Sequence, residues 1–170
     1  MMTITTTTQL QTAQLQTVQE LSNRFVALNQ AVLAFVRACS PTQWQAITAA
    51  EGWPVGVTAR HIAVAHYPVI EWVRMIVNGQ PLPPVTMDNV DQLNAQHAES
   101  HALCTQEEVC ELLATNSANV VAYLQSLPPI ALAGQGYLKL FESEISAEQL
   151  FVAVLLDGVA NHFNSIKAAV

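Results

Sequence analysis

Apolar residues recur three and four positions apart over the first part of the chain. This spacing places them on one face of an α-helix of the kind that packs in bundles, and it predicts a helix over residues 9–38. The residues of this apolar face are Val18, Leu21, Phe25, Leu28, Val32 and Phe35.

Helix start and stop signals divide the middle of the chain. A serine followed by proline predicts a short helix over residues 40–49. A second long helix is expected over residues 54–79, with Pro68 inside it as a kink or as the cause of an unpaired carbonyl. The polar stretch over residues 88–104 has room for another short helix.

Two capping boxes open the remaining long helices. The sequence T-x-x-E at residues 105–108 begins a third helix, which Pro128 and Pro129 stop. The sequence S-x-x-Q at residues 146–149 begins a fourth helix that runs nearly to Val170. A short extended piece is expected near residues 137–141. The apolar stripe of the third helix consists of Val109, Leu112, Leu113, Val120, Tyr123, Leu124 and Leu127.

These elements predict an all-α fold, a four-helix bundle with a long crossover between its second and third helices. We expect a single domain over residues 9–170 and a disordered tail over residues 1–8, which are rich in threonine. Apolar surface left over in such a bundle often forms a subunit interface, so a homodimer is also expected.

Composition limits the function classes. The 170 residues are 51% hydrophobic and 11% charged, which argues against disorder, and the net charge of −7 argues against nucleic acid as a partner. The longest apolar run, residues 150–156, is too short to span a membrane. Three cysteines without a CxxC pair, in a chain without an export signal, predict reduced thiols and a cytoplasmic location.

Histidines are the informative polar residues, because five of them stand in a chain with few charges. His61 lies near the start of the second long helix and His162 near the end of the fourth. In an antiparallel bundle, these two ends can meet. A separate candidate for zinc is the set His97, His101 and Cys104, which share one face if residues 88–104 are helical; the other reading of this set is a solvated loop.

Short motifs in this order resemble the DinB-like superfamily. Residues 53–63, with Trp53-Pro54 and His61-Ile62-Ala63, resemble the opening of its second helix, and residues 91–98 resemble its D-x-x-N segment. The ending His162-Phe163-Asn164-Ser165-Ile166 is similar to that of its last helix. The resemblance covers essentially the whole chain.

The resemblance implies a divalent metal (nickel, zinc, iron or manganese) on three histidines, one from the second helix and an H-x-x-x-H pair from the last. His61 and His162 match two of these ligands, but the third position holds Gly158. Asp157 and His66 are the possible substitutes for the third ligand. Each lies five residues from a matched histidine, and so not on the same helix face as that histidine. Because two imidazoles bind zinc or nickel weakly, we expect the metal to be absent or weakly bound.

The resemblance also implies the function. Relatives with known activity are metal-dependent hydrolases and thiol-dependent transferases or isomerases, so the expected reaction would act on a small molecule, with Asn94 and Trp53 in the pocket. The alternative is a metal-free bundle that binds a small ligand or forms a dimeric interaction module, and Gly158 favours it.

Overall fold

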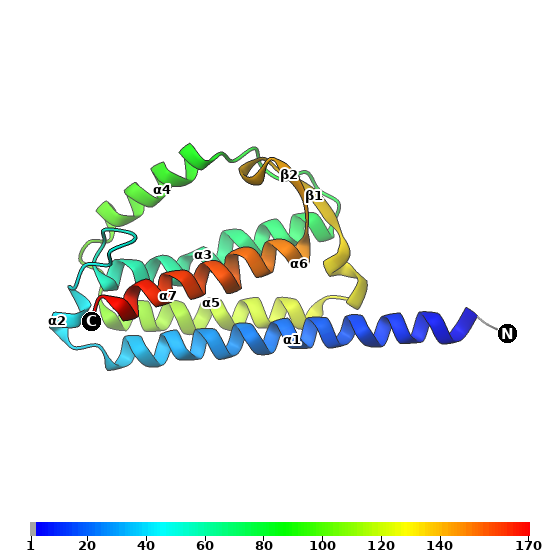
Figure 1. Ribbon diagram of the computed structural model, residues 1–170, viewed down its shortest axis with the longest axis horizontal. Helices are drawn as coiled ribbons and strands as arrows, with labels where there is room; N and C mark the ends of the chain where they lie inside the picture. Colours follow the sequence, from blue (N-terminus) through cyan, green and yellow to red (C-terminus); the bar gives the residue numbers. More distant parts are fainter. Residues whose placement is uncertain (1–2) are drawn as a thin grey trace.

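Long helices pack side by side along one axis in the computed structural model, which describes residues 3–170, with side chains from Thr17 onward (Figure 1). The four-helix bundle predicted from the sequence is confirmed. Within the described residues, no helix has both the length and the apolar character of a membrane span. The bundle consists of α1 (Thr3–Ala38), α3 (Val55–Val77), α5 (Gln106–Ser126) and a fourth helical rod made of α6 (Ala147–Leu150), η3 (Phe151–Gly158) and α7 (Val159–Ala168).

Helix starts follow the capping signals of the sequence. The side chain of Ser146 accepts a hydrogen bond from the backbone of Gln149, and the Gln149 side chain returns one to Ser146. Thr105 caps α5 through the backbone N–H of Glu108 at 3.2 Å. A disordered tail was predicted for residues 1–8. Of these, Met1 and Met2 lie outside the described residues, and residues 3–8 belong to α1.

Two short helices lie outside the bundle rods. The helix predicted over residues 40–49 ends early, because α2 (Pro41–Trp44) gives way to a chain that turns back so that Ile47 pairs with Pro54. The polar crossover holds α4 (Met87–Ser100), which contributes no buried residue and lies outside the packed helices (Figure 1).

A β-hairpin stands between α5 and the fourth rod, where only a short extended piece was predicted. Strand β1 (Gln135–Leu138) pairs antiparallel with β2 (Ser143–Ser146). The short helices η1 (Pro129–Ala133) and η2 (Lys139–Phe141) flank β1. With Leu138 and Ile145 buried, the hairpin closes the end of the core opposite α2.

Buried apolar side chains form two clusters along the bundle. One contains Phe25 and Phe151 with the buried hairpin residues. The other lies towards α2 and contains Trp44, Ile62 and Phe163. The second cluster supports the helix ends that carry His61 and His162.

The fourth rod changes its winding before it reaches His162. Residues of η3 (Phe151–Gly158) form a π-helix, and the α-helical pattern resumes at Val159. π-Helical turns inside α-helices are rare and occur frequently at functional sites. The segment therefore sets which face of α7 points to the rest of the bundle.

Gly56 is required by close packing at the start of α3. A Cβ there would lie 2.4 Å from Cε2 of Trp44, a buried ring whose Nε1 donates a hydrogen bond to the Cys104 carbonyl at 3.1 Å. We expect Gly56→Ala to lower the free energy of unfolding by about 1–3 kcal/mol, as overpacking does. Urea denaturation measures this change.

The matched control is Gly158→Ala, because the added Cβ meets only the Ala153 carbonyl at 3.4 Å. Alanine is the better helix former by about 0.5–1 kcal/mol, so this variant should be as stable as the wild type or more so. Equal stability losses in the two variants would contradict the packing argument.

Candidate functional site

His61 and His162 lie against each other at one end of the bundle. His61 comes from the second turn of α3 and His162 from α7, which runs antiparallel to it. Their ring centroids are 5.0 Å apart and the rings are nearly perpendicular. The structure thus brings together the two histidines that the sequence placed at the same end.

His97 joins this pair from α4. Its ring centroid lies 5.6 Å from that of His61, and its Nε2 lies 3.4 Å from the Val57 carbonyl oxygen. Trp53 contacts both rings, with centroid distances of 5.5 Å to His61 and 6.2 Å to His97. We call His61, His97 and His162 the histidine cluster.

Glu51 is a further residue of this site, and nothing in the sequence pattern singles it out. One carboxylate oxygen accepts a hydrogen bond from Nδ1 of His162 at 2.8 Å, and the other accepts one from Oγ of Ser165 at 2.6 Å. A carboxylate can only accept, so Nδ1 carries the hydrogen and Nε2 of a neutral His162 keeps its lone pair. No spacing rule in the sequence links residues 111 positions apart.

Burial lowers the pKa of two histidines of the cluster, His61 and His97. Desolvation, with smaller contributions from His162 and His97, lowers the pKa of His61 to about 4, so its ring is neutral at pH 7. Burial also lowers the pKa of His97. For Glu51, burial raises the pKa, but the hydrogen bonds from Ser165 and His162 outweigh it and the pKa is lowered. Glu51 is therefore ionised at pH 7.

The substitutes considered for the missing third ligand lie elsewhere. Asp157 is exposed on the fourth rod. His66 is fully buried against Phe25, with ring centroids 5.2 Å apart, and lines a different small cavity. Gly158 is half-buried and brings no donor.

The set His97, His101 and Cys104 does not share one helix face. Helix α4 ends at Ser100, so Cys104 lies in the turn beyond it, where its backbone N–H bonds to the His101 carbonyl at 3.1 Å. His101 does contact His97, at 5.1 Å between centroids. Burial raises the pKa of the Cys104 thiol, which disfavours the thiolate that binds zinc.

As the side chains stand, the described residues contain no group of three or more His, Cys, Asp or Glu residues arranged to hold one metal ion. The histidine cluster does offer suitable ligand atoms for a metal ion, since neutral imidazole is a common ligand of zinc and nickel.

An apolar cavity of about 290 Å³ adjoins the histidine cluster between α3 and α4. His61 and His97 form part of its wall, together with Asn94, which the sequence had placed in a pocket. The site as a whole is a cluster of three imidazoles, with one carboxylate, next to an apolar cavity.

Fold and site together define a class: a helical bundle with a histidine cluster at one end of its second and last long helices. The sequence profile of the DinB superfamily matches residues 24–156, and the chain belongs to that superfamily. Comparison with curated proteins and with solved structures gives no match.

Proposed function

We propose that the protein is a metal-dependent enzyme that binds a divalent ion at the histidine cluster and acts on a small molecule. His61 and His162 are two of the ligands, and His97 takes the place of the ligand missing at Gly158. The observation that carries this proposal is the convergence of three imidazoles from three separate helices.

Ring separations support this ligand set. Two imidazoles bound to one zinc at Zn–N distances of about 2.0–2.1 Å in tetrahedral geometry have centroids roughly 5 Å apart. The corresponding distances are 5.0 Å for His61 and His162 and 5.6 Å for His61 and His97.

Hydrogen bonds on the far side of two rings give further support. Histidines that bind metals usually donate their other N–H to a carboxylate or a backbone carbonyl, which fixes the ring and its tautomer. His162 donates to Glu51, and His97 faces the Val57 carbonyl. Both rings then keep one nitrogen free for an ion.

A divalent ion at this position would act as a Lewis acid and lower the pKa of a bound water or thiol, the chemistry that hydrolysis and thiol transfer share. The chain's own residues supply the surroundings. Glu51 orients His162, and Trp53 covers the rings of His61 and His97. The adjoining cavity receives the substrate.

The test is metal binding by protein stripped with chelator and then titrated with zinc or nickel, followed by calorimetry. We expect one ion per chain in the wild type and loss of this binding in His61→Ala, His97→Ala and His162→Ala, because two imidazoles are a weak site. Glu51→Gln should weaken binding about 10–100-fold, as loss of a ligand's hydrogen-bond partner does.

Asp157→Asn is the matched control, since Asp157 is a possible ligand by sequence and is exposed in the structure. Its metal affinity should equal that of the wild type. Unchanged binding in His97→Ala would show that another group supplies the third ligand. Absence of binding in the wild type would contradict the proposal.

The second candidate function is a metal-free protein that binds a small ligand in the same cavity. Gly158 and the absence of a ready three-ligand group among the described residues favour it. The titration separates the two functions, since a metal-free protein leaves zinc and nickel unbound in every variant.

A further inference from the structure

The cavity between α3 and α4 has an almost wholly apolar wall. No charged side chain lines it, and its volume of about 290 Å³ is that of about ten water molecules at ~30 Å³ each. The histidine cluster touches it only at one end, through His61 and His97. The remaining wall consists of Val64, Ala65, Pro68, Val69, Trp72, Val85, Val90, Leu93 and Asn94.

Helix α4 forms one wall without burying any of its own residues. Leu93 lines the cavity from this helix and is still 61% exposed. When a ligand covers a large apolar side chain, the complex is stabilised by roughly 25 cal/mol per Å² of apolar surface removed from water. The wall is therefore suited to an apolar occupant.

Pro68 also interrupts the backbone hydrogen bonds of α3 beside this wall. Pro68 has no N–H, so the carbonyl of Val64 lacks the donor that an α-helix normally supplies four residues later. Both residues line the cavity. An N–H or O–H group is the kind of donor that this carbonyl lacks within the helix.

We infer that this cavity binds the body of the substrate, an uncharged, mainly apolar molecule of about ten non-hydrogen atoms whose reacting end lies at His61 and His97. The role of substrate rests on the proposed function, but the binding of such a molecule does not require the metal. A charged body would lose its hydration without a partner in this wall.

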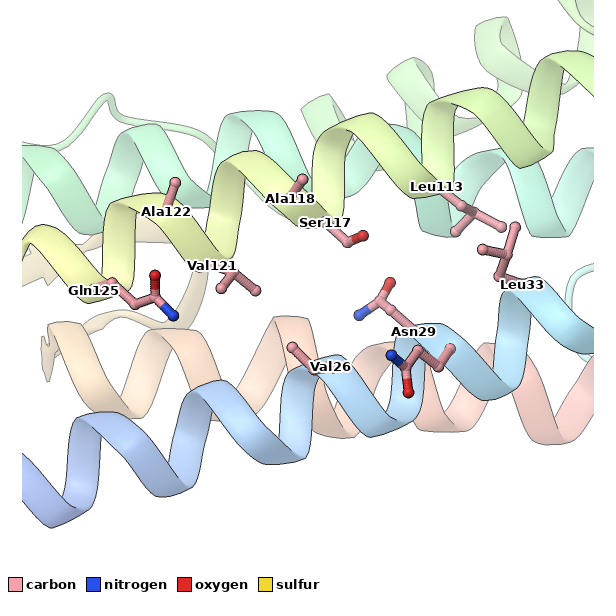
Figure 2. A pocket seen from close by; sticks show the side chains of 10 residues that line it. Val26, Asn29, Leu33, Leu113, Ser117, Ala118, Val121, Ala122 and Gln125 are labelled. Carbon is pink, nitrogen blue, oxygen red and sulfur yellow. The ribbon is translucent and has the colours of Figure 1, made fainter.

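A second cavity on another face of the bundle supplies the control. The groove between α1 and α5, of about 310 Å³, contains Ala118 (Figure 2). It differs from the first because polar side chains line it, among them Asn29, Ser117 and Gln125, as Figure 2 shows. Ala65 in the first cavity and Ala118 in the second allow the same substitution to fill either one.

The experiment uses indole, a neutral ring with one N–H, and follows backbone NMR shifts in chelator-treated protein and again after zinc is added. We expect saturable binding with shifts at Val64, Val69 and Leu93. Ala65→Phe should weaken it about tenfold or more, and Ala118→Phe should leave it unchanged. Tryptamine and indole-3-acetate, which carry opposite charges, should each bind more weakly than indole.

Binding of indole that Ala65→Phe leaves intact, or that Ala118→Phe removes, would overturn the inference, and so would tighter binding of either charged analogue. Zinc binding without indole binding would overturn it while the proposed function stands. Indole binding in a protein that takes up no metal would support the inference and contradict the proposed function.

Discussion

We expect that lowering the pH from 7 to 5 destabilises the wild-type protein by about 2 kcal/mol more than a His66→Leu variant, because His66 is buried as a neutral ring. His66 is fully buried, and neither ring nitrogen has a hydrogen-bond partner among the residues that the structure describes. Desolvation lowers its pKa from 6.5 to about 4.

The direction follows from proton binding in the two states. Below pH 6.5 the unfolded chain protonates this histidine, whereas the folded chain resists protonation until about pH 4. The unfolded state then binds more protons, so the stability that is present above pH 6.5 is lost as the pH falls towards 4. No charged side chain lines the cavity around His66 to offset this effect.

Urea unfolding at pH 7 and pH 5, in both proteins, measures the difference. Leucine suits the site, because the imidazole packs on Phe25 and beside Ile70 without a polar contact. Equal pH dependence in the two proteins would contradict the account. NMR titration of the His66 ring gives an independent value of its pKa.

Phe25→Ala has the largest expected effect on stability at neutral pH. Phe25 is fully buried and packs on Phe151 and His66, with ring centroids 5.7 and 5.2 Å away. Removing a buried phenyl ring leaves a cavity and costs about 3–5 kcal/mol, a large part of the stability of a small domain. Chemical denaturation of the variant measures this loss.

Phe25→Leu serves as the control, since it keeps most of the apolar volume and should cost clearly less than the alanine variant. A loss below about 1 kcal/mol for Phe25→Ala would mean that the surrounding helices collapse into the space. That result would also mean that the core around Phe151 rearranges more readily than its packing indicates.

The fold was predictable because local signals determine most of it. Capping residues such as Ser146 act over three positions, and the apolar spacing of α1 from Val18 to Phe35 extends over about five helical turns, so both are visible in one sequence. The hairpin was only partly foreseen, because β2 pairs with β1 across a turn and lacks apolar alternation. The homodimer stays a prediction.

The sequence predicted the candidate site only for the residues that the direction of the helices brings together. His61 and His162 met because antiparallel helices bring those ends together. The positions of Glu51 and His97 depend on how the loop before α3 and the crossover helix α4 fold back, which no periodicity encodes. Asn94 and Trp53, singled out through the resemblance, do lie beside these rings.

The π-helical segment η3 also has a consequence for comparing related chains. Counting back four residues from His162 to Gly158 assumes α-helical winding, yet Gly158 is the last residue of a wider turn. Deleting one residue from this segment would replace the wider turn by ordinary α-helical winding, while the helical segments on either side keep nearly the same orientation. In a related chain, the side chain beside His162 therefore depends on how this short stretch is wound as well as on which residues it contains.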